Sequence, residues 1–242
     1  MHNYSEIFSA RARQYHYAMQ CCPQARDAEF QAIVQDLPDS AVTVLDVPSG
    51  GGYLQRHLNS NVQLHSCDFS EGFAQTGVPL ASPTRLSFAD AVFDAVLSLT
   101  GLHHVPHVQQ DAFLGECLRV LRPGARLLVG EVWRGSSVDF FLNDFVHRHN
   151  SQGHVGEFFD DGFLPRLQTA GFAQATRSVR SYFWQFESVP TMVDYCRNLF
   201  GIDNADDEQI EAGLRDVLDY KQTGDGRVQL HWQLVFFQAV KR

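Results

Sequence analysis

The chain has 242 residues, of which 44% are hydrophobic and 19% are charged, as in an ordinary globular protein that can bury a core. Its formal net charge is −9, and the excess of acid is spread out: 8 basic and 13 acidic residues in 1–133 give −5, and 11 and 15 in the remainder give −4. With neither a basic half nor a run of Lys or Arg to neutralise phosphates, the composition disfavours a nucleic-acid partner.

Targeting signals are not evident in the sequence. No stretch reaches the roughly 20 apolar residues needed to cross a bilayer, and residues 1–13 are polar and mixed, without the apolar core of a signal peptide. The five cysteines are odd in number and form no C-x-x-C pair, which argues against a disulfide framework or a cysteine zinc site. We therefore expect a cytoplasmic protein, a monomer or homodimer, with no membrane span.

The N-terminal part predicts two helices followed by a buried strand. Residues 4–19 and 24–37 have helical character and are separated by Pro23, which interrupts helices. Residues 42–47 form a short β-branched run that stops at Pro48 and three glycines. Such a run predicts a strand of a parallel sheet, buried on both faces.

The middle of the chain alternates strands and helices. Leu54 and Leu58 have helical spacing, a second strand ends at Asp68, and the ambiguous segment 69–87 contains the stub of a third strand at 78–81. This alternation predicts an α/β fold with a parallel sheet, whose ligands bind at the carboxyl ends of the strands. The elements predicted next are a strand at 93–99, a helix around 114–121 ended by Arg122-Pro123-Gly124, and a strand from 127 toward 133.

The C-terminal half is less regular. Pro190 and Gly201 bracket one of its helices, and Asp206-Asp207-Glu208 open another. Residues 228–236 alternate strictly between apolar and polar positions, which is typical of a strand. Further elements are predicted as helices at 137–150 and 160–170 and an extended segment at 172–186.

The strongest motif is Asp46-Val47-Pro48-Ser49-Gly50-Gly51-Gly52, at the end of the first predicted strand. Its glycines allow a sharp turn and a close approach of backbone N–H groups to a ligand. A dinucleotide-binding loop would need a third glycine where Gln55 stands, and a P-loop would need a lysine that is absent here. Asp68, 22 residues after Asp46, follows the second predicted strand, where an acid can accept hydrogen bonds from ribose hydroxyls.

Over about residues 40–133 the sequence resembles the class I methyltransferases that use S-adenosylmethionine (SAM), in particular the small-molecule enzymes of methyltransferase type 11. An acid four residues before a G-x-G resembles the first motif of that family. The block 11–29 looks more loosely like the lid helix that precedes the domain in some members. The other matching segments are Arg85-Leu86-Ser87-Phe88, Phe93-Asp94-Ala95-Val96, Gly101-Leu102-His103-His104 and Arg119-Val120-Leu121-Arg122-Pro123-Gly124.

The resemblance implies a fold and a cofactor site. The fold is a Rossmann-like, mostly parallel seven-stranded sheet flanked by helices. The N-terminal helical lid is at 1–40, the SAM-binding core at 41–133, and the remainder of the core at 134–242, with cap insertions at about 134–158 and 187–224. Asp46 would bind the ammonium group of SAM, Asp68 its ribose, and Phe69 would lie beside the adenine. The other implied cofactor contacts are Tyr15, Ser49, Gly50, Gly51, Gly52, Ser82 and Leu99.

Two residues depart from the family pattern. Pro48 stands where the loop usually begins with a glycine, which removes one N–H donor. Ser82 stands near the position of an acid that often binds the adenine amine. Both departures concern the affinity for SAM more than the fold.

The histidines suggest a general base. His104 ends a strand on the ligand side of the sheet, and a histidine near its ordinary pKa of about 6.5 can accept a proton at neutral pH. The alternative for His104 is that it only packs or hydrogen-bonds to hold its loop. His154, in the polar part of the predicted cap, is a second candidate base. Two groups of histidines suggest a metal site as an alternative: His103, His104 and His107, and His147, His149 and His154. With neither an H-E-x-x-H motif nor a cysteine partner, the sequence predicts no metal site.

Three functions remain open from the sequence. The first is a SAM-dependent methyltransferase that transfers a methyl group to an O or N atom of a small, partly apolar metabolite by in-line displacement. The second, motivated by Pro48 and Ser82, is a degenerate methyltransferase fold that serves as a partner-binding subunit. The third is an NAD-dependent oxidoreductase, which is disfavoured because Gln55 stands where a dinucleotide-binding loop has its third glycine.

Overall fold

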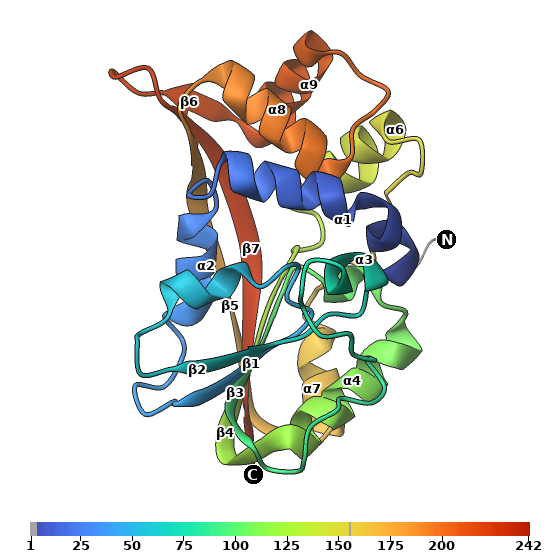
Figure 1. Cartoon of the computed structure of the whole chain (residues 1–242), viewed down its shortest axis with the longest axis vertical. Helices are drawn as coiled ribbons and strands as arrows, with labels where there is room; N and C mark the ends of the chain where they lie inside the picture. The colour runs from blue at the N-terminus through green and yellow to red at the C-terminus, as the bar shows by residue number, and fades with distance from the viewer. Residues whose placement is uncertain (1–3, 155) are drawn as a thin grey trace.

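The computed structural model describes residues 4–154 and 156–242; residues 1–3 of the predicted lid and residue 155 of the predicted cap lie outside the described residues. The strands form one seven-stranded sheet with the order β2-β1-β3-β4-β7-β5, and β6 pairs with β7 (Figure 1). Their bounds are β1 Thr43–Asp46, β2 Gln63–Ser66, β3 Phe93–Leu99, β4 Leu121–Glu131, β5 Phe172–Phe186, β6 Tyr220–Gln222 and β7 Val228–Lys241.

The sheet is mixed. The pairs β1–β2, β1–β3 and β3–β4 are parallel, whereas β7 is antiparallel to β4, β5 and β6. The predicted α/β class with a Rossmann-like sheet is confirmed, and β7 alone runs against the other six strands. The parallel strands place the carboxyl ends of β1 and β3 side by side, where the functional residues lie.

Helices cover both faces of the sheet, because side chains alternate along each strand. Val44 of β1 packs in the apolar cluster that includes α2, and Leu45 packs in the cluster that includes α4 and α7. The helix bounds are α1 Tyr4–Cys21, α2 Asp27–Val34, α3 Glu71–Ala74, α4 His107–Val120, α5 Ser137–Phe140, α6 His147–His149, α7 Phe163–Thr169, α8 Val189–Phe200 and α9 Asp207–Gly213.

Three local predictions need correction. The third strand expected at 78–81 is a single bridge between Asp68 and Leu80, since Pro79 has no N–H with which to extend a ladder. The segment after Gly52 is one 3-10 turn, Tyr53–His57. Strand β4 begins at Leu121, six residues before the predicted start, so Pro123 and Gly124 lie inside it, at a register irregularity opposite β3.

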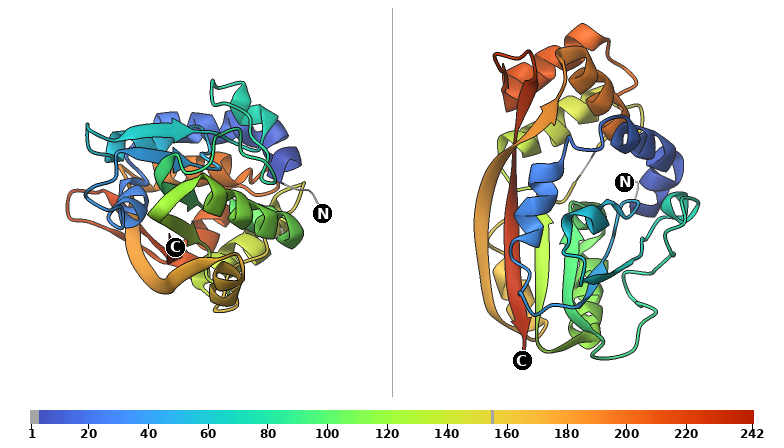
Figure 2. Two further views of the ribbon diagram at one scale, coloured as in Figure 1. Left: turned by 90° about the horizontal axis from the view of Figure 1, so that it is seen from below. Right: turned by 60° about the vertical axis from the view of Figure 1, so that its left-hand side comes forward.

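The strands β5 and β7 extend beyond the parallel strands and support a cap. Pairing between β4 and β7 ends at Glu131↔Val235, whereas β5 and β7 stay paired as far as Phe186↔Val228. Figure 2 shows these two long strands as one wall that rises to α8 and α9. Trp184 of β5 and Trp232 of β7 stack at 4.1 Å between ring centroids and are buried beneath α8 and α9.

Helix α1 lies between the cap and the sheet (Figure 1), packed against α8 on one side and α3 on the other. Gly72 permits the second contact, because a Cβ atom at this position would lie 2.1 Å from the carbonyl oxygen of Phe8. The helix thereby covers the carboxyl ends of β1 and β3. Among the described helices, none combines the length and apolarity that a membrane span requires.

Candidate functional site

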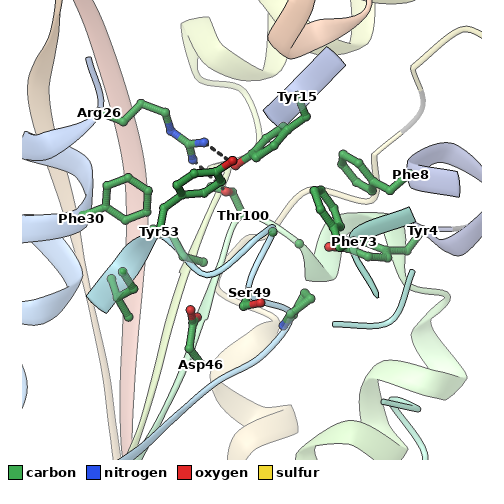
Figure 3. A pocket seen from close by; sticks show the side chains of 15 residues that line it. Tyr4, Phe8, Tyr15, Arg26, Phe30, Asp46, Ser49, Tyr53, Phe73 and Thr100 are labelled. Atoms are coloured by element: carbon green, nitrogen blue, oxygen red, sulfur yellow. Dashed lines mark hydrogen bonds between the residues drawn. The ribbon is translucent and has the colours of Figure 1, made fainter. Parts of the chain in front are cut away.

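A small pocket of about 50 Å³ lies at the carboxyl ends of β1 and β3, beneath α1. In Figure 3, Asp46 and Ser49 lie on one side of it, and Tyr15, Arg26 and Tyr53 lie on the other. Half of the predicted cofactor residues therefore line one cavity: Tyr15, Asp46, Ser49, Gly50 and Leu99. The remaining lining residues are Tyr4, Phe8, Arg26, Phe30, Pro48, Tyr53, Leu54, Phe73, Thr100 and Gly101.

The glycine loop has the backbone that its sequence predicts. Gly50, Gly51 and Gly52 have φ angles of 56°, 104° and 78°, a left-handed run in which side chains other than glycine are strained. The loop closes over β1, and the Gly50 N–H donates a hydrogen bond to Asp68 at 2.9 Å. Pro48 packs against Gly101, where a Cβ atom would lie 2.3 Å from the proline ring. The proline is accommodated by a glycine on the neighbouring strand end.

Asp46 is a buried carboxylate without a partner. Only 4% of the residue is exposed, and none of the groups in residues 4–154 and 156–242 donates a hydrogen bond to its side chain. Burial, together with the nearby charge of Asp68, raises its pKa well above the ordinary range. The Ser49 hydroxyl is also buried without a hydrogen-bond partner in the described chain. An unpaired acid beside an unpaired hydroxyl fits a cationic ligand that also offers a polar atom.

Asp68 is held by the protein itself. Its carboxylate accepts hydrogen bonds from the Tyr4 hydroxyl at 2.9 Å, from the Gly50 N–H and from the Ser70 N–H at 2.9 Å. Burial raises the pKa of Asp68 to about 6, although these hydrogen bonds oppose the shift. The predicted ribose ligand is therefore beside the pocket but covered by the first residue of α1.

Four of the other predicted contacts lie away from the cavity wall. Phe69 is buried between the rings of Tyr4 and Phe113. Ser82 is exposed and hydrogen-bonds to Thr84 at 3.0 Å, because the segment after the single bridge at Leu80 turns outward. Gly51 and Gly52 shape the loop from behind the lining residues.

Sequence reasoning missed the cation at this site, Arg26. Its guanidinium is buried, donates to the Tyr15 hydroxyl at 2.7 Å, and forms an ion pair with Glu29. Glu29 is fully buried and also accepts a hydrogen bond from the Trp184 indole N–H at 2.9 Å. The sequence feature that could have revealed this ion pair is an Arg and a Glu three residues apart in a segment that otherwise packs as core. This network joins α1, α2 and β5 behind the pocket.

Next to the pocket, three histidines converge. One ring nitrogen each of His103, His104 and His154 lies within 4.8 Å of the other two. Burial lowers the pKa of both predicted bases, His104 and His154, well below the ordinary value, so both are neutral at pH 7. His103 was not predicted; its Nδ1 lies 2.7 Å from the carboxylate of Glu131, at the end of β4. His104 packs against Tyr4 and Phe8 of α1, which also line the pocket.

Comparisons with known families agree with this geometry. Residues 45–129 match the family described as a methyltransferase domain. The demethylmenaquinone methyltransferase of Beutenbergia cavernae is 43% identical over 98 residues, which cover 36% of this chain and 40% of that protein. The enzyme of the same name from Mycolicibacterium vanbaalenii is 32% identical over 139 residues, 54% of this chain and 60% of that protein. The matches thus span about half the length of these curated relatives.

Solved structures share the fold over the whole chain. A SAM-dependent methyltransferase of Thermotoga maritima, described as a possible histamine N-methyltransferase, has a TM-score of 0.62 and 18% identity, covering 99% of this chain and 100% of that one. A phosphoethanolamine N-methyltransferase of Haemonchus contortus, solved with S-adenosyl-L-methionine, has a TM-score of 0.61 and 14% identity, covering 100% of this chain and 60% of that one. At such identities the likeness concerns the fold.

Proposed function

We propose that this chain, which belongs through residues 45–129 to the class I SAM-dependent methyltransferase family, transfers a methyl group from SAM to an O or N atom of a small, partly apolar acceptor. The observation that carries the proposal is Asp46, a buried carboxylate that faces the pocket without a partner. The ammonium group of SAM is a cation of the kind that such a site requires.

The pocket residues have complementary roles toward this cofactor. Asp46 would bind the ammonium group, and the unpartnered Ser49 hydroxyl would bind a polar atom of the same end. Asp68 would accept the ribose hydroxyls once Tyr4 withdraws from it. SAM supplies the activated methyl group when bound. The rings of Tyr4, Phe8 and Tyr15 would exclude water above it.

The acceptor would bind on the side of the histidine cluster. His104 lies beyond the pocket-lining residue Gly101 and touches the aromatic rings of α1. Burial lowers the pKa of His104 and of His154, so each ring is neutral but its protonated form is disfavoured. The two rings would therefore accept a hydrogen bond from an acceptor hydroxyl more readily than they would take its proton. Methyl transfer to the lone pair of an O or N atom requires mainly that this atom be aligned with the methyl group. The histidine cluster and the aromatic walls would therefore chiefly position the acceptor.

Calorimetric titration with SAM and with S-adenosylhomocysteine tests the proposal. We expect both to bind with dissociation constants on the order of micromolar, about −8 kcal/mol. Nicotinamide dinucleotides serve as the control ligand and should give no signal. Absence of SAM binding at millimolar concentration would overturn the proposal and favour the partner-binding subunit, in which the fold is retained without its cofactor.

Replacement of Tyr4 by phenylalanine should tighten SAM binding by up to about tenfold. The Tyr4 hydroxyl occupies Asp68, and a hydrogen bond to a charged group contributes about 1.5 kcal/mol that the cofactor must displace. The exposed Tyr17 of the same helix provides the control: Tyr17→Phe should leave the affinity unchanged. Weaker binding in Tyr4→Phe would indicate instead that the hydroxyl contacts the cofactor directly.

A further inference from the structure

We infer that His103, His104 and His154 form a binding site for a divalent transition-metal ion of the Zn²⁺ class. The three residues come from two segments about 50 positions apart, and one nitrogen of each lies within 4.8 Å of the other two. Three imidazoles with an open fourth position are a ligand set found at catalytic zinc ions. The inference rests on this convergence and on the hydrogen-bond partners of the rings.

Asn143 fixes the tautomer of His154. The Asn143 side-chain oxygen accepts a hydrogen bond from the Gly156 N–H at 3.0 Å, and its NH₂ group donates to the Gly156 carbonyl at 3.2 Å. The amide is therefore oriented with its oxygen toward His154 Nδ1, at 3.1 Å. Since that oxygen only accepts, Nδ1 must carry the proton, and Nε2 of His154 keeps its lone pair for a ligand.

Glu131 does the same for His103. Its carboxylate lies 2.7 Å from His103 Nδ1, is fully buried, and accepts a second hydrogen bond from the Leu102 N–H at 2.7 Å. A carboxylate behind the distal nitrogen orients the ring and increases the basicity of the ligating nitrogen, as in many metal sites. His104 completes the set, because its Nδ1 is buried and has no hydrogen-bond partner among the described residues.

The charge balance permits a cation here. The fully buried carboxyl group of Glu131 contacts the cluster through His103, and the Arg11 guanidinium lies near His104 and His154. The Arg11 guanidinium is directed elsewhere, since it donates to the Leu199 carbonyl at 2.9 Å. Zn–N bonds of about 2.0–2.1 Å place ligand nitrogens on the order of 3.4 Å apart, so ring rotation must close the widest gap by about 1.4 Å.

The site lies beside the pocket, so a bound ion would take part in the proposed function. This second part of the inference rests on that function. An ion with one open position beside the pocket would bind an acceptor through its oxygen, nitrogen or sulfur atom and lower the pKa of that group. His104 and His154 would then act as ligands, and the charge of the ion would take the place of a free imidazole base. Acceptors with a hydroxyl, phenolate or thiol group are the class that this arrangement favours.

Zinc binding to the full-length protein, measured without SAM, tests the site. Protein stripped with a chelator is titrated with Zn²⁺ in competition with a chromogenic chelator, and we expect one tight ion per chain. His154→Ala and His103→Ala should weaken binding at least about 100-fold, and Glu131→Gln about 10- to 100-fold. His107→Ala is the matched control, because His107 is exposed, pairs with Glu157, and should not affect binding.

Two further results distinguish binding at this site from binding to surface histidines and from an effect of misfolding. Co²⁺ bound to the unmodified protein should give the intense visible absorption of a four-coordinate ion with nitrogen ligands, and Zn²⁺ should abolish it. Zn²⁺ affinity that is equal in the wild type and in the folded His103 and His154 variants would overturn the inference, as would Co²⁺ with only the weak spectrum of a hydrated ion. Because no SAM is present, either failure leaves the proposed methyltransferase function untouched.

Discussion

Replacement of Asp46 by asparagine should weaken SAM binding by about 100-fold and at the same time stabilise the ligand-free protein. The expected loss follows from the ion pair that we propose between Asp46 and the ammonium group of SAM, since removal of one partner of a buried pair costs about 3 kcal/mol. The gain arises because the free protein keeps this carboxylate unpaired and close to Asp68. The neutral amide removes that repulsion and the desolvation of a charge, for an increase in unfolding free energy of about 1–3 kcal/mol.

The stabilisation should depend on pH in one direction. The pKa of Asp46 is raised in the folded state, so the folded protein binds a proton more tightly than the unfolded chain does. Wild-type stability therefore decreases as pH rises from the unfolded value of about 3.9 through the raised pKa, and it is constant above that. The advantage of Asp46→Asn should grow over the same window and be absent below it.

Denaturant unfolding at several pH values and calorimetry with SAM measure both effects. Asp39→Asn, at an exposed acid just before β1, is the control and should change neither quantity. An Asp46 variant that binds SAM like the wild type would remove the assignment of the ammonium site. A variant that is less stable than the wild type at neutral pH would show that the Asp46 carboxylate is paired in the folded protein.

Replacement of Glu29 by alanine should destabilise the protein by about 3–5 kcal/mol, because it leaves the Arg26 guanidinium buried without its anion. The Trp184 indole N–H loses its acceptor in the same step. For a protein of this size such a change lowers the melting temperature by about 6–20 °C. Since Arg26 also holds the Tyr15 hydroxyl, the wall of the pocket should loosen as well.

Asp27→Ala is the matched control for Glu29. Asp27 lies in the same helix and pairs with Arg56 at a largely solvent-accessible site, where an ion pair contributes at most about 1 kcal/mol. The loss of stability measured by thermal and denaturant unfolding should thus be severalfold larger for Glu29→Ala than for Asp27→Ala. Similar melting temperatures would mean that Arg26 is reached by water and that the buried network contributes little to stability.

The residues that sequence reasoning located best are those joined by local chain geometry. Asp46, Ser49 and Gly50 follow one strand, so the glycine pattern alone brings them to the same pocket. Ser82 was misplaced because Pro79 reduces the third strand to a single bridge, and the chain beyond it turns outward. The position of an element can be inferred from spacing only when the preceding strand forms.

Contacts between distant segments could not be predicted from the sequence. The histidines at 103 and 104 and those at 147, 149 and 154 look like two separate groups, and only the fold selects His154 from the second to join the first. In the structure His147 Nδ1 lies 2.8 Å from the His154 carbonyl oxygen, and His149 Nδ1 lies 3.1 Å from the Asn204 carbonyl oxygen. Likewise, no spacing rule pairs Tyr4 with Asp68 or Glu29 with Trp184.

The pairing of β5 with β7 makes the cap a modular insertion. Residues 187–227, which contain α8, α9 and β6, leave the sheet after Phe186 and return at its register partner Val228. The two ends of the insertion are therefore adjacent, and a shorter or a foreign segment can join them without shifting the register of the core. Any graft must still bring an apolar face to cover Trp184 and Trp232. Exchange of this segment between relatives would thus test the proposed role of the cap in acceptor binding, with residues 41–133 unchanged.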